Sequence, residues 1–292
     1  NTGTSTLNLS GQLGTNTHVL VANGTGTGDA VNVVNTNTAV ASTFNARPLT
    51  LTGIETINLN GGATATAAQS TGAIGMTGTG TNPALGVNVS GANAFTMAAV
   101  TPVGTGLLSI SGAGLTAQAT GTTFTVAAPV SPGGTVSITG SAGNDSLTGD
   151  VTDATTIVGG FGDDTITGGA AVDSLSGGDG NDTFTAVSVA NMSADTISGG
   201  TGTLDVLNFS NGANAFSVAA ADLAKIVGIE KITAHTDTTT LSVVLTDAVY
   251  TSNGAGLTVD GNNIDGSAGA DLTVDASALT GSNAVTVVMS TA

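Results

Sequence analysis

Apolar and polar residues alternate in short runs along most of this chain, and turn-forming residues separate the runs. Alternation with a period of two is the pattern of strands that bury one face. The fold class predicted from this pattern is all-β, with little helix. The predicted strands lie at residues 6–9, 18–21, 30–33, 49–51, 56–59, 86–89, 95–97, 107–110, 124–126, 136–138, 241–245, 257–259, 272–274 and 285–287.

Two segments depart from the strand pattern. Residues 218–227 are the best helix candidate, with Ser217 as the predicted N-cap. Residues 62–84 are low in complexity and rich in Ala, Thr and Gly, and we interpret them as a loop or a weak coil.

Between Gly140 and Thr185 the alternation changes to a nine-residue step rich in glycine and aspartate. Residues 159–167 and 177–185 fit G-G-x-G-x-D-x-U-x at every position, where U is a large apolar residue. Residues 140–148 and 168–176 each lack one glycine of the pattern, and residues 149–158 form a degenerate unit that is one residue too long.

The nine-residue step has a direct physical interpretation. Six residues of glycine and aspartate form a turn, and three residues form a short strand whose apolar U side chain points inward. If each unit is half a coil, turns on one edge recur every 18 residues, which is the separation of Asp164 and Asp182. Stacked turns then bring carboxylates and carbonyl oxygens together in a cage of hard oxygen ligands that suits Ca²⁺.

This segment resembles the repeats-in-toxin (RTX) β-roll of bacterial secreted proteins, whose nonapeptide binds calcium. The resemblance implies a parallel β-roll or β-solenoid with flanking stacked strands, and Ca²⁺ as the bound ion. Asp164 and Asp182 are the expected carboxylate ligands. The resemblance implies carbonyl ligands from Gly159, Gly160, Gly162, Gly177, Gly178 and Gly180. Further ligand candidates are Gly143, Asp145, Asp173 and Asp205, the last displaced by one residue in its unit.

The charge of the chain is strongly acidic and unevenly distributed. Three Lys and Arg residues face 20 Asp and Glu residues, which gives a net charge of −17. Ten of the 18 aspartates lie between Asp145 and Asp205, which indicates cation binding more than general solubility. Only Arg47, Lys225 and Lys231 could meet phosphates, so nucleic acid and anionic membranes are poor partners.

Several kinds of chemistry are missing from the sequence. Cysteine is absent, so neither disulfides nor thiolate metal sites hold the fold. His18 and His235 are the only histidines, and neither the H-E-x-x-H nor the G-x-S-x-G pattern occurs. The only glutamates, Glu55 and Glu230, each occupy a G-I-E-x-I phrase and are interpreted as exposed strand or turn residues. We therefore expect no enzyme, and no membrane insertion because no apolar run approaches ~18 residues.

A longer sequence pattern occurs once in each half of the chain. Asp29 precedes one G-I-E-x-I phrase and Asp205 precedes the other at nearly the same distance. Repeats of this kind suggest a solenoid or stacked sheets along the whole chain. Together with residues 272–279, these phrases resemble bacterial surface-layer (S-layer) proteins of the RTX type.

The expected function is that of a structural extracellular protein that binds Ca²⁺ and assembles with itself into a cell-surface layer or filament. The resemblance implies type I export, and a cell-surface polysaccharide is a further partner that we consider. The alternatives are a calcium-stiffened segment of an RTX adhesin and the non-catalytic C-terminal part of a secreted RTX hydrolase. Three regions are expected: 1–138 for assembly, 139–209 for calcium, and 210–292 as a second β-rich region.

Overall fold

The structure is a computed structural model, and the part of the chain it describes is the subject of every structural statement below. The described residues are 4–9, 21–23, 28–35, 49–61, 69–71, 74–77, 84–91, 95–97, 100–103, 106–115, 123–125, 134–210, 215–235, 240–253, 256–262, 264 and 271–289.

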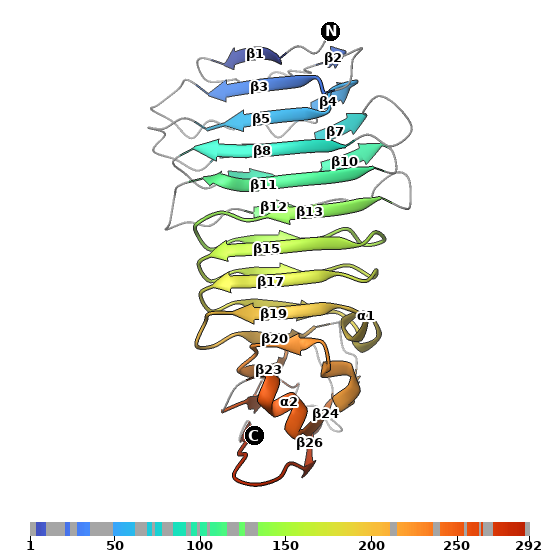
Figure 1. The fold of residues 1–292 in the computed structure, drawn as a ribbon, viewed down its shortest axis with the longest axis vertical. Coiled ribbons are helices and arrows are strands. Elements are labelled where there is room, and N and C mark those ends of the chain that lie inside the picture. The colour runs from blue at the N-terminus through green and yellow to red at the C-terminus, as the bar shows by residue number, and fades with distance from the viewer. Residues whose placement is uncertain are drawn as a thin grey trace.

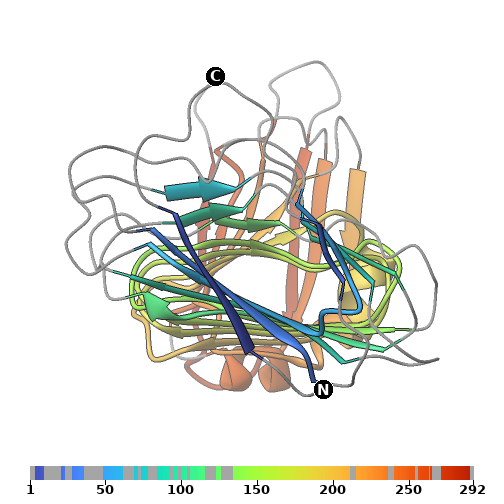
Figure 2. The same ribbon diagram turned by 90° about the horizontal axis from the view of Figure 1, so that it is seen from above.

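The described chain winds into a parallel β-solenoid, in which the strands of each coil pair with those of the next (Figure 1). The coils stack along the long axis, with the two termini toward opposite ends (Figure 1). In the view down this axis the green and yellow coils superimpose as a flattened loop (Figure 2). The all-β, parallel β-roll predicted from the sequence is therefore confirmed.

Two long sheets form the walls of the solenoid. Sheet 1 contains β1 (Thr4–Leu9), β3 (Ala30–Asn35), β5 (Thr56–Asn60), β8 (Leu85–Gly91), β11 (Leu107–Leu115), β13 (Thr135–Thr139), β15 (Thr155–Phe161), β17 (Ser174–Asp179), β19 (Thr196–Gly200) and β22 (Ile226–Val227). Sheet 2 contains β6 (Gln69–Thr71), β9 (Phe95–Met97), β12 (Thr123–Thr125), β14 (Ser146–Thr148), β16 (Thr165–Thr167), β18 (Thr183–Ala186), β20 (Val206–Phe209), β23 (Lys231–Ala234), β25 (Thr258–Asp260) and β27 (Thr286–Val288).

Two shorter sheets add a third side toward each end. Sheet 3, near the N-terminus, contains β2 (Val21–Asn23), β4 (Leu49–Thr52), β7 (Ile74–Thr77) and β10 (Val100–Val103). Sheet 4, near the C-terminus, contains β21 (Ala215–Val218), β24 (Thr240–Thr246) and β26 (Asp271–Ala278). Between them, residues 134–210 alternate directly between sheets 1 and 2 and form two-stranded coils. Sheets 1 and 2 run through all three regions expected from the sequence.

The core consists of columns of inward-facing side chains, one from each coil. In sheet 1 the column members are fully buried and pair in register with their neighbours along the axis. They are Val31, Ile57, Val87, Ile110, Ile138, Ile157, Leu175, Ile197 and Ile226. Because a side chain and its neighbours on the strand point to opposite faces, the alternation in the sequence places one apolar column inside and small polar residues outside.

The strand predictions are confirmed along the chain, since every predicted run overlaps a strand, although residues 18–20 lie outside the described residues. The predicted loop or weak coil at residues 62–84 contains β6 and β7 in its described part. Its small residues gave a weak periodic signal, yet Ile74 and Met76 are fully buried.

The helix predicted at residues 218–227 is wrong. Val218 ends β21, a single 3-10 turn, η1 (Ala220–Leu223), follows, and Ile226 begins β22. The segment turns the corner from sheet 4 to sheet 1 and buries Leu223 and Ile226 on the way, so packing overrides its helical pattern. Ser217 lies in β21 and caps nothing. The actual helices, α1 (Val189–Ala194) and α2 (Asp247–Ser252), were not predicted.

Neither of these helices, nor η1, has the length and apolarity needed to cross a bilayer. Ser188 caps α1, because its Oγ accepts a hydrogen bond from the amide of Asn191 at 3.1 Å. Thr246 caps α2 in the same way.

The columns predict a large effect of truncating a core side chain. Phe184→Ala removes a ring that is 1 % exposed, and should lower the free energy of unfolding by about 3–5 kcal/mol. Thr165→Ala, in the adjacent coil but on the exposed face, should change it by less than about 0.5 kcal/mol. Urea unfolding at saturating CaCl₂ measures both, and equal effects would contradict the inward assignment of Phe184.

Candidate metal centre

The turns between sheet 1 and sheet 2 have the same backbone shape in successive coils. Gly160, Gly178 and Gly200 all have a φ of 121°, and Gly162 and Gly180 have φ values of 105° and 129°. These values lie in the region that side chains disfavour, so glycine is required at each position. The glycines of the nonapeptide therefore form the turns that the sequence predicted.

Aspartates stack along this edge of the solenoid and form a ladder with the backbone. The Oδ1 atom of Asp164 accepts the amide of Asp145 at 2.7 Å, and Oδ1 of Asp182 accepts the amide of Asp164 at 2.8 Å. Asp205 Oδ1 accepts the amide of Asp182 at 2.7 Å, and Glu230 Oε2 accepts that of Asp205 at 2.7 Å. Each carboxylate thus caps the acidic residue of the preceding coil, and the four aspartates are buried.

Asp205 was expected to be a ligand candidate displaced by one residue, and the structure shows no such displacement. Its carboxylate lies in register with the others, because the extra residue of its unit is absorbed in the turn before it. Asp145, Asp164, Asp182 and Asp205 therefore lie together on one edge.

Within the ladder on this edge, the second carboxylate oxygens distinguish the two complete nonapeptides from the first unit. Oδ2 of Asp164 and Oδ2 of Asp182 are buried and have no hydrogen-bond partner. In the first unit, Ser141 replaces a glycine and its amide donates to Asp145 Oδ2 at 2.5 Å, so that oxygen is satisfied within its own turn. A buried carboxylate oxygen without a partner is costly, and a cation would supply what is missing.

Each of these carboxylate oxygens lies near a backbone carbonyl oxygen of the next coil. A Cβ built on Gly159 would collide with both Asp164 Oδ2 and the carbonyl oxygen of Gly177. A Cβ on Gly177 would likewise collide with Asp182 Oδ2 and the carbonyl oxygen of Gly199. The absence of side chains at these glycines therefore leaves a pocket lined by carboxylate and carbonyl oxygens.

This donor set fits Ca²⁺, which takes oxygen ligands from both carboxylates and backbone carbonyls. No three carboxylate or imidazole groups cluster closely enough to hold a metal ion by themselves in the described part of the chain. A bound ion would therefore need carbonyl oxygens for much of its coordination, which the family resemblance implies for Gly159, Gly160, Gly162, Gly177, Gly178 and Gly180. Gly143 lies against Gly162 in the adjacent turn and belongs to the same edge.

Asp173 lies on the opposite edge, where the chain returns from sheet 2 to sheet 1. Its Oδ1 accepts the amide of Thr155 at 2.8 Å, and Asp195 Oδ1 accepts the amide of Asp173 at 2.8 Å. Its Oδ2 accepts the amide of Gly169 at 2.5 Å. Asp173 is therefore part of a second ladder, and the structure does not bring it together with Asp164 and Asp182.

Three members of this second edge were not among the ligands predicted from the sequence. Thr155 takes the ladder position in its coil, and Asp195 follows α1, which separates it from Asp173 by 22 residues. Asp150 is fully buried, with Oδ1 bound to the amide of Thr152 and Oδ2 without a partner. The nine-residue step is lost in both places, so the spacing of the repeats did not indicate these residues. Only the presence of the aspartates themselves could have indicated this part of the edge.

The two G-I-E-x-I phrases form the same structural unit at different places in the fold. Glu55 Oε2 accepts the amide of Asp29 at 2.9 Å, as Glu230 Oε2 does for Asp205. The glycines of the two phrases have φ values of 65° and 67°. The prediction that these glutamates are exposed is wrong, since Glu55 is 8 % exposed and Glu230 is half-buried.

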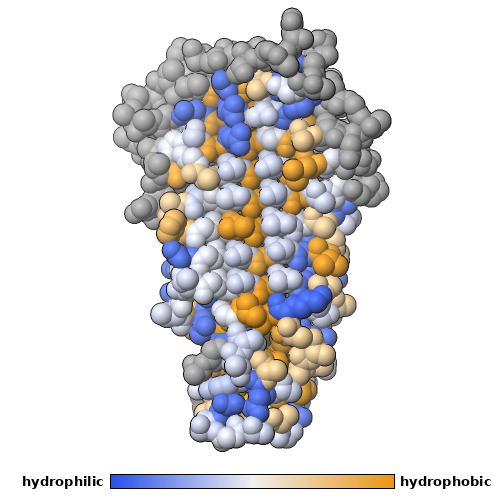
Figure 3. Space-filling view, in the orientation of Figure 1, coloured by the Kyte–Doolittle hydropathy of each residue, from blue (hydrophilic) through white to orange (hydrophobic). Residues whose placement is uncertain are grey.

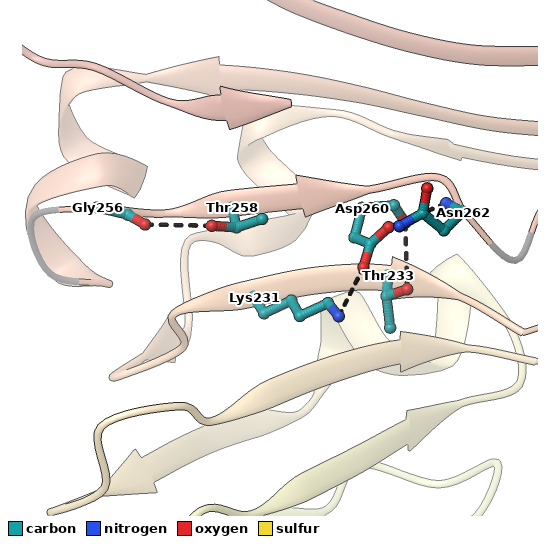
Figure 4. A network of polar contacts seen from close by, with 6 residues as sticks. All are labelled: Lys231, Thr233, Gly256, Thr258, Asp260 and Asn262. Atoms are coloured by element: carbon teal, nitrogen blue, oxygen red, sulfur yellow. Dashed lines mark hydrogen bonds and ion pairs between the residues drawn. The ribbon is translucent and has the colours of Figure 1, made fainter. Parts of the chain in front are cut away.

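Beyond Glu230 the solenoid supplies its own cation. Lys231 Nζ lies 2.6 Å from Asp260 Oδ2 in the next coil of sheet 2 (Figure 4). Asp260 Oδ1 also accepts the amide of Asn262 at 2.9 Å, and its carbonyl accepts Thr233 Oγ1 at 3.1 Å (Figure 4). An ammonium group thus neutralises the acidic residue of this coil, in place of a bound ion.

Burial raises the pKa values of aspartates on the first edge. The pKa of Asp164 is raised to about 8, chiefly by desolvation; the hydrogen bond from the Asp145 amide opposes this rise, and the neighbouring carboxylates, Asp145 first, add to it. Desolvation also raises the pKa of Asp182 to about 6 and that of Asp195, on the other edge, to about 6. Without a cation these groups therefore favour the protonated form.

The raised pKa values predict an unusual pH dependence for the calcium-free chain. The folded state binds protons that the unfolded state releases between pH 3.8 and about 8, so the free energy of unfolding falls as pH rises through this window. With calcium the slope should flatten or reverse, because the ion binds the deprotonated carboxylates. Urea unfolding with chelator and with CaCl₂ at pH 5 and pH 8 measures this, and equal slopes would contradict it.

An amide substitution at the same site should change stability in opposite directions with and without the ion. Asp164→Asn keeps Oδ1 for the Asp145 amide but removes the buried charge. We expect the calcium-free variant to be more stable than the wild type above pH 8, and its calcium affinity to be weaker by about tenfold or more. Asp163→Asn is the matched control, because Asp163 is exposed and its Oδ1 serves only the amide of Asn181. Calorimetric titration and urea unfolding measure both effects, and equal behaviour of the two variants would exclude Asp164 as a ligand.

Comparison with known families agrees with the geometry of this edge. The family model of the RTX calcium-binding nonapeptide repeat (4 copies) matches residues 133–153 and 151–184. No curated protein and no solved structure matches the chain. The matched residues cover the two-stranded coils that hold Asp145, Asp164, Asp173 and Asp182. This part of the chain is therefore a segment of RTX calcium-binding repeats, folded as a parallel β-roll.

Proposed function

We propose that this chain is a structural extracellular protein that binds Ca²⁺ along its β-roll and assembles with itself into a cell-surface layer or filament. The observation that carries the proposal is the ladder of buried aspartates, in which Asp164 and Asp182 each keep an unpartnered oxygen. A fold whose buried carboxylate oxygens require a cation is completed only where the calcium concentration is high. RTX repeats are typical of secreted proteins, which meet calcium outside the cell.

Calcium then acts as a ligand of the folded state alone. The ladder positions are 18 or more residues apart in sequence, so an unfolded chain cannot hold the same cage. An ion that binds only the folded state stabilises it by about 2.7 kcal/mol at a concentration of 100 Kd. Such coupling supports a chain that stays unfolded during export and folds after it.

The walls of the roll support close packing between copies. Thr156, Ser174 and Thr196 form one exposed row of small side chains along sheet 1, and Ser146 and Thr165 begin another along sheet 2. Pale columns of such small residues run along the face seen in Figure 3. Because the carboxylates are held at the edges, these walls can approach a second copy without strong repulsion.

We assign the chain no catalytic role in this proposal. The aspartates of both edges accept backbone amides, which suits a structural role better than proton transfer. The second candidate function is a calcium-stiffened spacer in an RTX adhesin, which the elongated stack of Figure 1 favours. The non-catalytic part of a secreted RTX hydrolase is a third.

Assembly with and without calcium tests the proposal. In millimolar CaCl₂ we expect ordered sheets or filaments by electron microscopy and a large mass by light scattering, both dispersed by chelator. The double variant Asp164→Asn, Asp182→Asn should need much more calcium for the same assembly, whereas Asp163→Asn should behave as the wild type. A wild-type chain that folds with calcium but stays monomeric would reject the proposal in favour of the spacer.

A further inference from the structure

The turn of residues 149–155 holds an aspartate where the complete nonapeptides have their second glycine. Asp150 follows Gly149 in the degenerate unit of the repeat, which is one residue too long. The turn lies on the second edge, which is the right-hand edge in Figure 1, where α1 also lies. Thr155, and not an aspartate, takes the ladder position of this coil. The nonapeptide pattern alone therefore predicts no bound ion in this turn.

One oxygen of the Asp150 carboxylate caps the turn. Its Oδ1 accepts hydrogen bonds from the amide of Thr152 at 2.7 Å, from the hydroxyl of Thr152 at 3.0 Å and from the amide of Asp153 at 2.9 Å. A neutral asparagine or serine side chain can accept bonds of this kind, so they do not require a negative charge.

The other oxygen of Asp150 does require an explanation. Asp150 is fully buried, and its Oδ2 has no hydrogen-bond partner within the described part of the chain. Burying a carboxylate is costly unless a positive group or further hydrogen bonds accompany it. The free oxygen of Asp150 therefore indicates a ligand that the turn itself does not supply.

A second buried carboxylate reaches the same place from the next coil. A Cβ built on Gly169 would collide with the carbonyl oxygen of Asp150, and a Cβ on Gly168 would collide with Oδ2 of Asp173. The two stacked turns thus bring Asp150 and Asp173 against one pair of glycines. Desolvation is the main cause of the raised pKa of Asp173, and the charge of Asp150 adds to it. The two carboxylates therefore lie close enough to repel each other.

The basic side chains that the structure describes are used elsewhere. Lys225 donates to the carbonyl of Ala194, and Lys231 pairs with Asp260. Asp153, which is 5 % exposed, adds another buried carboxylate to the turn of Asp150. A divalent cation would remove the repulsion between these groups, and Ca²⁺ is the ion that prefers carboxylate and carbonyl oxygens together.

We propose that residues 149–155 and 168–173 form a separate Ca²⁺ site on the second edge, with Asp150 Oδ2 as its main carboxylate ligand. Asp173 and the carbonyl oxygen of Asp150 supply further oxygens from the two stacked turns. The site differs from a nonapeptide site because its ligand stands at a glycine position and Thr155 replaces the repeat aspartate. The inference rests on the calcium binding in the proposed function, but not on self-assembly.

Counting the bound ions tests the site. Native mass spectrometry and equilibrium dialysis in CaCl₂ should find one Ca²⁺ fewer per chain in Asp150→Asn than in the wild type. Val151→Thr is the matched control, because Val151 belongs to the same turn, is 56 % exposed and carries no charge. This control should keep the wild-type number of ions. Equal numbers in Asp150→Asn and Val151→Thr would overturn the inference.

Urea unfolding at pH 8 separates a ligand from a turn cap. Asp150→Asn keeps an oxygen for the amides of Thr152 and Asp153 but removes the buried charge. With chelator it should unfold at a higher urea concentration than the wild type, and with CaCl₂ at a lower one. A turn cap alone predicts the same shift in both conditions, so shifts of equal sign would contradict the site.

Asp150→Ser is a second variant that removes the carboxylate and keeps a hydroxyl group for the turn. Circular dichroism in CaCl₂ checks that both variants fold. We expect Asp150→Ser to lose the same ion as Asp150→Asn. If neither variant folds with or without calcium, Asp150 has a structural role and the inference fails.

The double variant Asp164→Asn, Asp182→Asn separates this site from the first edge. An ion that remains in the double variant and is lost when Asp150→Asn is added supports the second-edge site, even if no calcium-dependent layer or filament forms. Calcium-dependent assembly of the wild type, with no ion lost in Asp150→Asn, leaves the proposed function standing and rejects this inference.

Discussion

The hydrogen bond from each ladder carboxylate to the amide of the preceding coil is the contact on which the roll depends. It fixes the spacing of successive turns and places four aspartates along one buried edge. The same contact creates a cost, because buried carboxylates repel each other and lose their hydration. On this edge the cost is greatest for Asp164 and Asp182, since Oδ2 of each has no hydrogen-bond partner. The fold of residues 134–210 is therefore complete only when something positive joins it.

The free-energy cost of burying these carboxylates is offset in three different ways along the stack. The two complete nonapeptides leave a pocket of oxygens for an ion. The first unit satisfies Asp145 through Ser141, whose amide and hydroxyl both bind the carboxylate. At the C-terminal end of the ladders, lysine side chains supply the positive charge. Lys231 pairs with Asp260, and the ammonium group of Lys225 donates a hydrogen bond to the carbonyl of Ala194. Burial raises the pKa of Asp195, and the charge of Lys225 opposes this rise. Calcium is thus needed in the middle of the stack more than at its C-terminal end.

Much of this arrangement was predictable because it depends on local periodicity. The alternation of apolar and polar residues predicted the strands, and the nine-residue step predicted that Asp164 and Asp182 would stack. The features that were missed break the periodicity: α1 inserts residues before Asp195, and Thr155 stands where an aspartate would be expected. The false helix at residues 218–227 had a helical pattern, but the burial of Leu223 and Ile226 at a corner between two sheets decided its structure. The structure of such a corner depends on the positions of strands that are distant in sequence. The local pattern of residues does not contain that information.

The paired G-I-E-x-I phrases show how the ladder continues where coils are longer. A two-stranded coil advances 18 residues between Asp164 and Asp182, whereas Asp205 and Glu230 are 25 residues apart and Asp29 and Glu55 are 26 apart. In both longer coils glutamate replaces aspartate, and its additional methylene lets the carboxylate reach the same kind of amide. The repeated phrase is therefore a structural joint for these longer coils, and it explains why the only two glutamates of the chain occur in matching contexts. The same backbone contact is thus used with and without the nonapeptide, so the RTX repeats can merge into coils that lack the motif without interrupting sheets 1 and 2.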